Sequence, residues 1–423
     1  MSLVLRALPG RLLIAALALS AAVAGSGCGA FDAPEVRPCA WLDRPSGENP
    51  EGAARTAVLV DRSSSTRPGA RTAPGAPVPD WGATLVRELD VAALEGGTLS
   101  IAGFDGTRAT VDWEADRASV SRVEGTDTTK GDRRRARRGC LEERIRTVSA
   151  GTPRSGRTDV LGALAAAVDQ LGPQAGRRRV VVATDGLVNT GCADLRSLGF
   201  DGTAEIDATV ARCRTAGELP GLKGVEVALV GIGMTAGGPV PTSPQTTWLT
   251  TLWTGLCRAA GAADCRVEAT ARTRGAGGSD VVKHPTMEPV VTFPAVSERP
   301  AGRVTTITIP GSVLFATDTA ELSPQARGTL DDAAKRVREL GPLSVAVSGH
   351  TDSRGSEERG RRLSLDRAEA VRAALAARGI TVLTARGHSD DRPRCTPEYR
   401  DGEPDHAAMA CNRRVEIAVT VRR

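Results

Sequence analysis

Aromatic and histidine side chains are scarce in this chain. Phe, Trp and Tyr make up 3% of its 423 residues, with a single Tyr, and there are only 4 His. Proteins that bind single-stranded nucleic acid stack the bases on aromatic rings, so this scarcity argues against a nucleic-acid partner. No Cys-x-x-Cys pair stands with His at zinc-ligand spacing, which argues against a structural zinc site. The formal net charge of +5 is also close to balance.

An apolar run long enough to span a bilayer is missing near the N-terminus. The apolar stretch at residues 12–24 has about 13 residues, fewer than the roughly 20 of a spanning helix. It follows Arg6 and Arg11 and precedes small residues, which is the layout of an export signal. Gly25-Ser26-Gly27-Cys28 then resembles the lipobox of bacterial lipoproteins, although that family prefers a larger aliphatic residue in place of Gly25.

The lipobox resemblance implies a signal peptide over residues 1–27 and a lipid-modified Cys28 that anchors the protein to a membrane. Residues 28–54 hold Pro, Gly and Glu without periodicity, and we expect a tether there. The alternative is an ordinary secretory signal that is cut near Ala24 and leaves Cys28 as a free thiol.

Cysteine usage agrees with export to an oxidising compartment. The chain has 9 Cys, and setting Cys28 aside leaves an even number, which predicts four disulfides. We expect two local pairs, Cys257 with Cys265 and Cys395 with Cys411. The pairing of Cys39, Cys140, Cys192 and Cys213 stays open, because connectivity does not follow from sequence alone.

Strand-like and helix-like segments alternate over residues 55–271. Apolar runs predict strands and helical spacing predicts helices, at residues 57–60, 81–94, 98–104, 159–171, 180–183, 225–230 and 247–260. This alternation predicts an α/β domain with a doubly wound, mainly parallel sheet that is covered on both faces. Residues 272–303 are rich in Gly and Pro and predict a linker, and residues 304–423 predict a smaller α+β domain.

Three oxygen-bearing segments follow predicted elements of the first domain. Asp61-Arg62-Ser63-Ser64-Ser65 follows its first strand, Thr158 precedes the helix at 159–171, and Thr184-Asp185-Gly186 follows the strand at 180–183. In an open α/β sheet, ligands collect outside the carboxyl ends of the strands, so we expect Asp61, Thr158 and Asp185 to converge there. Hydroxyls and carboxylates without His or Cys suit Mg²⁺ or a similar hard cation.

These segments, in this order, resemble the metal-ion-dependent adhesion site of von Willebrand factor A domains over residues 55–271. The resemblance implies Asp61, Ser63 and Ser65 as direct ligands of Mg²⁺ or another divalent cation. Thr158 and Asp185 would complete the coordination sphere directly or through water. It also implies an adhesion module that recruits an unidentified protein partner. In the alternative, the fold is right but the site holds no metal, and Asp61 and Ser63 only cap the next helix.

A second candidate site lies in residues 304–423. Ser348-Gly349-His350-Thr351-Asp352 follows a predicted strand, and Arg367 lies near the start of a predicted helix. Such a pair holds a zwitterion, because Asp352 takes an ammonium while Arg367 and backbone N–H groups take a carboxylate. Diaminopimelate, the branching amino acid of many peptidoglycans, offers both groups on one end. The alternative is an internal salt bridge between Asp352 and Arg367 that only fixes the loop.

These motifs, with Asn412-Arg413-Arg414-Val415-Glu416-Ile417, resemble the C-terminal domain of outer membrane protein A, shared with peptidoglycan-associated lipoprotein and flagellar stator proteins. The resemblance spans residues 304–423 and implies non-covalent binding of peptidoglycan stems. The implied binding residues are Asp352, Arg367, Thr351, Arg413 and Arg414, one of the last two serving alternatively to brace the sheet. Gly360 stands where the family commonly has Asn, and Ala316 replaces a frequent Asp, so two polar contacts are lost.

The whole sequence therefore predicts a membrane-anchored lipoprotein of the cell envelope that faces the cell wall. We expect no enzyme, because the chain has no Gly-x-Ser-x-Gly elbow, no His-Glu-x-x-His and no convincing Cys–His arrangement. A cell-wall-remodelling enzyme is the main rival hypothesis, and an accessory component of a motor or pore is the third. We expect the basic run at residues 133–138 to be a solvated loop and the run at residues 177–179 to lead into a strand. The alternative is that these runs contact anionic lipid, teichoic acid or nucleic acid.

Overall fold

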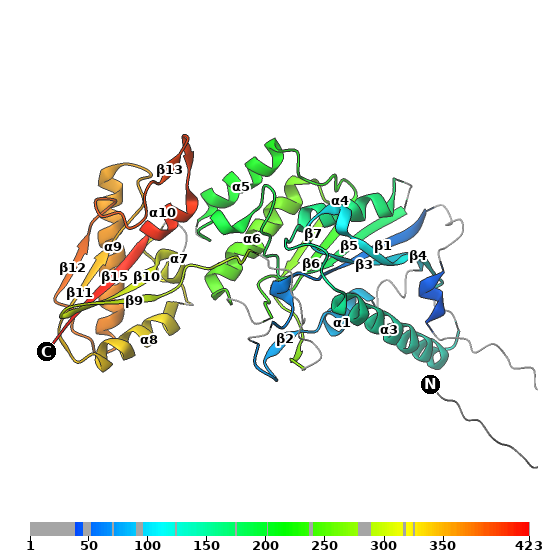
Figure 1. Cartoon of the computed structure of the whole chain (residues 1–423), viewed down its shortest axis with the longest axis horizontal. Coiled ribbons are helices and arrows are strands. Elements are labelled where there is room, and N and C mark those ends of the chain that lie inside the picture. The colour runs from blue at the N-terminus through cyan, green and yellow to red at the C-terminus, as the bar shows by residue number, and fades with distance from the viewer. Residues whose placement is uncertain are drawn as a thin grey trace, which may run out of the picture. The chain divides into compact units, whose positions relative to one another are not determined.

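The structure is a computed structural model of the whole chain (Figure 1). It describes residues 39–44, 52–69, 72–89, 96–122, 125–173, 176–200, 202–236, 240–277, 289–315, 319–324 and 326–422. The predicted signal peptide and Cys28 lie outside the described residues. Within the described residues, none of the helices has both the length and the apolarity that a bilayer crossing requires.

A six-stranded sheet organises the first domain, in the order β4-β3-β1-β5-β6-β7. Only the edge pair of β3 and β4 is antiparallel, and the other neighbours run parallel, so the prediction of a mixed α/β domain with parallel strands is confirmed. The strands are β1 (Gly52–Asp61), β3 (Gly97–Phe104), β4 (Asp112–Val120), β5 (Gly176–Ala183), β6 (Val225–Val230) and β7 (Asp264–Glu268).

Helices cover both faces of this sheet, which explains the unbroken apolar run in β1. Leu59 packs with α4, α5 and α6 on one face, and Val58 and Val60 pack with α1 and α3 on the other. A strand buried on both faces has no polar side to alternate with, so its apolar residues are consecutive. The helices are α1 (Trp81–Thr84), α3 (Asp127–Ala150), α4 (Val160–Leu171), α5 (Thr203–Thr215) and α6 (Ser243–Ala259).

The packed part of the first domain begins earlier than the sequence predicts. A disulfide joins Cys39 to Cys140 of α3, and the 3-10 helix η1 (Ala40–Asp43) buries Leu42 against the domain. The expected tether over residues 28–54 therefore does not extend through Cys39. Its composition gave no sign of this, because one cysteine and one leucine provide the attachment.

All four predicted disulfides are present. The local pairs Cys257–Cys265 and Cys395–Cys411 are confirmed, and the open pairings resolve as Cys39–Cys140 and Cys192–Cys213.

The basic run at residues 133–138 is not a loop but part of the 24-residue helix α3. Thr126 caps this helix, because its side chain accepts a hydrogen bond from the Thr129 N–H. Arg has a high intrinsic helix propensity, so a run of Arg is compatible with a helix even where nothing apolar packs. The apolar spacing used for prediction is absent there, which is why the sequence pattern failed.

The C-terminal domain has a five-stranded sheet in the order β12-β11-β15-β10-β9. Its apolar core packs the helices α8 (Ala326–Glu339) and α9 (Glu357–Ala376) on the sheet. Helix α9 begins well before the predicted start near residue 365, since Ser356 caps it at the Arg359 N–H. The strands are β9 (Ser297–Ala301), β10 (Val304–Pro310), β11 (Pro342–Gly349), β12 (Thr384–Gly387) and β15 (Arg414–Val421). The short elements are α7 (Gly311–Leu314), α10 (His406–Asn412), β13 (Tyr399–Arg400) and β14 (Glu403–Pro404).

Much of the expected linker at residues 272–303 is paired with one of the domains. The strand β8 (Thr273–Gly275) pairs with β2 (Pro77–Pro79), and β9 pairs with β10 at the edge of the C-terminal sheet. Val291 is buried in the core of the first domain. Gly and Pro make the segment irregular, but these contacts fix its described parts.

Removing the Cys39–Cys140 disulfide should strongly destabilise the first domain. In the chain-entropy description, a link across 101 residues contributes about 4–5 kcal/mol, whereas the Cys257–Cys265 link across 8 residues contributes about 2–3 kcal/mol. We therefore expect the double change Cys39→Ser and Cys140→Ser to cost more than Cys257→Ser and Cys265→Ser. Urea unfolding followed by tryptophan fluorescence measures this, since all five Trp precede residue 254. An equal loss in both double variants would contradict it.

Candidate functional site

The first candidate site lies at the carboxyl ends of two neighbouring parallel strands. Asp61 ends β1, and Asp185 follows β5 by two residues, while the pairing of Val60 with Ala183 places the two strand ends side by side. Both carboxylates are fully buried. The Thr184 hydroxyl donates a hydrogen bond of 2.6 Å to Asp61 Oδ2, which links the two segments directly.

The turn after β1 brings the two serines of the motif beside Asp61. The Ser63 N–H donates to Asp61 Oδ1 at 2.8 Å, and the Ser63 and Ser65 hydroxyl oxygens lie 3.2 Å apart. The short 3-10 helix η2 (Ser64–Thr66) follows, and the Ser63 side chain makes no capping hydrogen bond to it. The hydroxyls of both serines therefore lie together, with Ser63 buried and Ser65 partly exposed.

Two residues outside the predicted set hold the Thr158 loop in place. The Thr158 N–H donates to Asn189 Oδ1 at 2.8 Å, which ties this loop to the segment that follows Asp185. Asp105 accepts hydrogen bonds from the N–H groups of Arg154 and Ser155 through its carboxylate, and from that of Asp159 through its carbonyl. Neither residue has a sequence pattern that marks it, because each acts through the backbone of a distant loop.

The donor set of this site is two carboxylates and three hydroxyls. In the described ranges, no three side chains of the His, Cys, Asp and Glu types gather as a metal site, and this set differs because only two of its five side chains are of those types. Buried hydroxyl and carboxylate oxygens are the ligands that hard cations such as Mg²⁺ accept. The residues present therefore fit a divalent cation.

The second candidate site is built around Asp352, three residues after the end of β11. Its side chain is 6% exposed and accepts hydrogen bonds from Arg354 Nη2 at 2.7 Å, from Arg354 Nε at 3.1 Å and from Arg413. Burial raises the pKa of Asp352, but the hydrogen bonds and charges of Arg354 and Arg413 outweigh it and leave the pKa below the ordinary value. Asp352 is therefore an ionised carboxylate beneath two guanidinium groups.

Arg367 lies on α9 and has other partners. Its Nε donates to the Thr319 carbonyl at 2.9 Å, and its guanidinium carbon lies 5.1 Å from the centroid of the Phe315 ring. Arg367 as a whole is buried, with 3% of its surface exposed. The carboxylate of Asp352 is instead paired with Arg354 and Arg413, and the sequence did not single out Arg354 at all.

The two adjacent arginines near the end of the chain have different roles. Arg413 contacts Asp352, whereas Arg414 donates to Glu416 Oε1 at 2.7 Å and to the Asn412 carbonyl at 3.2 Å. His350, whose Nε2 lies 3.6 Å from Glu416 Oε2, lowers the pKa of Glu416 to about 2 together with Arg414, against the effect of burial. Arg413 is thus paired with Asp352, whereas the described partners of Arg414 are Glu416 and the carbonyls of Asn412 and Arg392.

Ser389 fills the space that a side chain at position 360 would take. A Cβ on Gly360 would lie 2.3 Å from Ser389 Oγ and 3.3 Å from Thr351 Oγ1. Ser389 has φ +48° and is held there by Ser364 Oγ, which accepts from its N–H at 3.0 Å, and by the Thr351 N–H, which donates to its carbonyl. Thr351 Oγ1 is buried without a hydrogen-bond partner among the described residues. The hydroxyls of Ser389 and Thr351 thus lie next to position 360, while Ala316 lies outside the described residues.

The comparisons concern the C-terminal part of the chain. Residues 314–399 match the model of the OmpA family, so the C-terminal domain is OmpA-like, and such a domain indicates peptidoglycan binding in the cell envelope. The particular relatives include outer membrane protein P5 of Haemophilus influenzae, which is 33% identical over 136 residues, 31% of this chain and 37% of that protein. The probable lipoprotein YiaD of Escherichia coli is 31% identical over 116 residues, 27% of this chain and 50% of that protein.

Among solved structures, the cell wall anchor of the type VI secretion system from Pseudomonas aeruginosa is 31% identical, with a TM-score of 0.26. The match covers 30% of this chain and 88% of that one. The chain thus spans between about a third and a half of the length of the curated relatives described above.

The close approach of Ser389 to Gly360 predicts an unusual response to Gly360→Ala. A Gly to Ala change inside a helix normally stabilises it by about 1 kcal/mol, but here the new methyl group would meet Ser389 Oγ. We expect Gly360→Ala alone not to stabilise the C-terminal domain, and to stabilise it by about 1 kcal/mol once Ser389→Gly is also present. Scanning calorimetry of the four chains of this double-mutant cycle measures the coupling, and simple additivity would contradict the packing.

Proposed function

We propose that this protein is a binding and scaffold component of the cell envelope. Its C-terminal domain holds peptidoglycan non-covalently, and its first domain is a metal-dependent adhesion module of the von Willebrand factor A type that recruits a protein partner. A lipid on Cys28 anchors the chain to a membrane, with the folded domains facing the cell wall. No chemical step is required for this role, and we propose no enzymatic activity.

The buried carboxylate of Asp352 carries the peptidoglycan proposal. It lies within reach of two guanidinium groups, inside the stretch that matches the OmpA family. An ammonium group carries the same charge as a guanidinium and can replace one of them on the carboxylate. Arg354 is the one to be displaced, since its side chain is 31% exposed, whereas that of Arg413 is 6% exposed.

Diaminopimelate fits this exchange because it offers an ammonium and a carboxylate on the same carbon. Its ammonium would take the place of Arg354 on Asp352, and its carboxylate would bind Arg367. The hydroxyls of Thr351 and Ser389, which lie together beside Gly360, support additional hydrogen bonds to the stem. Arg413 would remain on Asp352 and keep it ionised.

Loss of either main charge should abolish binding to the wall. We expect Asp352→Ala and Arg367→Ala to lower the affinity for purified peptidoglycan by at least about tenfold in co-sedimentation, since each leaves a charged group of the ligand unpaired. Arg354→Gln should keep or raise the affinity, because it uncovers Asp352.

The matched controls for this experiment are Arg372→Ala on the same helix and Asp331→Ala on α8, which have exposed side chains in surface ion pairs. Both should sediment like the parent chain. Sedimentation of the Asp352→Ala chain at the parent level, with calorimetry indicating an intact fold, would refute the site.

The metal proposal rests on the grouped oxygens at the ends of β1 and β5. Asp61, Ser63 and Ser65 would coordinate Mg²⁺ or another divalent cation directly, and Thr158 and Asp185 would complete the set directly or through water. Five protein oxygens leave at least one coordination position of such an ion open, so an acidic side chain of a partner protein can complete its coordination. The hydrogen bonds of Asn189 and Asp105 to the Thr158 loop favour a preformed site.

Added Mg²⁺ should therefore raise the melting temperature of the first domain, because a ligand that binds only the folded state stabilises it. We expect Asp61→Ala to remove this increase. Asp169→Ala is the control, since Asp169 is an exposed acid of the same domain paired with Arg108. Tryptophan fluorescence isolates the first domain, because all five Trp belong to it. An equal response of parent and Asp61→Ala chains would exclude this site.

A further inference from the structure

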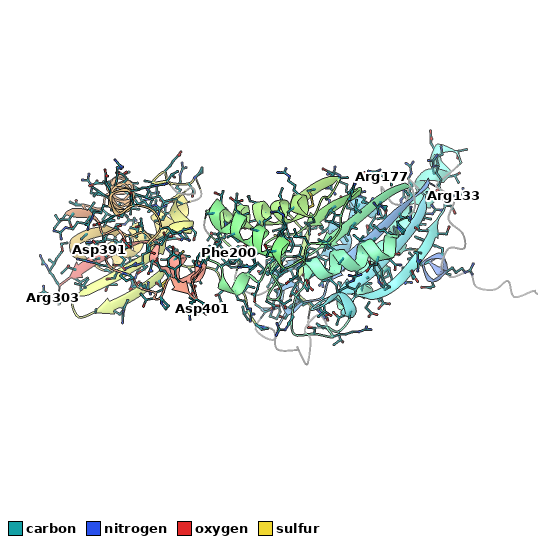
Figure 2. All side chains as sticks on the ribbon, turned by 90° about the horizontal axis from the view of Figure 1, so that it is seen from above. Arg133, Arg177, Phe200, Arg303, Asp391 and Asp401 are labelled. Atoms are coloured by element: carbon teal, nitrogen blue, oxygen red, sulfur yellow. A yellow bond between two sulfur atoms is a disulfide. The ribbon has the colours of Figure 1, made fainter. Side chains whose placement is uncertain are left out.

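The first half of α3 projects beyond the core of its domain. The buried residues of this helix begin at Cys140, so residues 127–139 include no buried side chain. At 1.5 Å per residue, this unpacked half is roughly 20 Å long. Figure 2 shows Arg133 at the outer edge of the first domain. This half of α3 therefore contributes no buried side chain to the domain core.

The projecting half is strongly basic. Residues 130–138 contain six basic residues and one acidic residue. Two ion pairs partly offset this charge, Arg135 with Asp132 at 3.8 Å and Arg138 with Glu142 at 3.1 Å. The side chain of Arg135 nevertheless remains 84% exposed. The net positive charge of the segment therefore faces solvent.

The side chains of the other basic run of this domain, at residues 177–179, contact groups of the same domain. Arg177 pairs with Glu226 at 2.8 Å, Arg179 pairs with the buried Glu88, and Arg178 donates to the Lys223 carbonyl at 2.6 Å. Its charges hold strands and loops of the domain together. The ion pairs described for the run on α3, with Asp132 and Glu142, lie within the helix itself, and this contrast favours an external partner for α3.

The Cys39–Cys140 disulfide connects the base of this basic segment to the N-terminal part of the chain. Cys140 is the first buried residue after the basic run, and Cys39 lies eleven residues after Cys28. Eleven residues span at most about 40 Å when fully extended. A lipid on Cys28 would therefore keep the basic half of α3, itself roughly 20 Å long, close to the membrane surface.

We propose that the basic half of α3, residues 130–138, docks on anionic lipid headgroups of the membrane. Guanidinium groups bind phosphate oxygens through paired hydrogen bonds, and each basic residue near an anionic surface adds to the attraction. The contact orients the first domain on the membrane and turns the remaining surface toward the wall. The proposal goes beyond peptidoglycan binding and does not depend on it.

Vesicle co-sedimentation tests this docking without the lipid anchor. The chain from residue 29 onward contains every described residue, including the compact unit over residues 38–423. We expect it to bind vesicles that contain phosphatidylglycerol and not vesicles of phosphatidylcholine alone. Binding should weaken as salt is raised, because the Debye length shortens. Arg133→Gln, Arg134→Gln and Arg135→Gln together should lower the partition coefficient by at least about tenfold.

The control is Arg214→Gln, Arg258→Gln and Arg327→Gln, which removes the same charge from exposed positions elsewhere. It should bind like the parent chain, and unchanged melting temperatures and peptidoglycan sedimentation in both triple variants would show that the fold is intact. The proposal is overturned if the parent chain shows no preference for anionic vesicles, or if both triple variants lose binding equally. It is also overturned if the triple variant of α3 binds anionic vesicles like the parent chain and loses only its binding to phosphate-bearing wall polymers.

Discussion

The arrangement of both folded domains depends on a carboxylate that is withdrawn from water near the end of a central strand. Asp61 at the end of β1 and Asp352 after β11 are both buried. An isolated buried charge is very costly, so the surrounding loops must supply hydrogen bonds or opposite charge. In each domain, one donor lies two residues after the carboxylate and another comes from a distant segment, at Thr184 or Arg413. The carboxylate thereby determines which loops converge at that edge of the sheet.

The two buried carboxylates accept hydrogen bonds from different kinds of donor, and this difference affects what each carboxylate can bind. Asp61 receives a hydroxyl from Thr184 and an N–H from Ser63, which are neutral donors. Such donors stabilise a negative charge without neutralising it. Asp352 receives the guanidinium groups of Arg354 and Arg413. Two guanidinium groups more than balance its charge, so under the proposed function a cationic ligand exchanges with one of them, and Arg354 is the more exposed.

The sequence predicted those features that depend on local pattern. The apolar runs located β1, β5 and β6, and the order of motifs predicted an OmpA-like C-terminal domain. The features it missed have no local sequence pattern that marks them. Arg354 was overlooked because nothing in its neighbourhood indicates that it turns back onto Asp352. Ser389 and Gly360 meet across 29 positions, and α3 was missed because half of it packs against nothing apolar.

The disulfides have one further consequence, for how the chain matures. Each cysteine bonds to the next one along the chain, so none of the four links encloses or crosses another. An oxidase that joins thiols in the order of their emergence during export would produce this set directly, without reshuffling. The proposed acylation of Cys28 matters here too. An unmodified thiol at Cys28 would emerge first and pair with Cys39, and each later cysteine would then pair with the wrong neighbour.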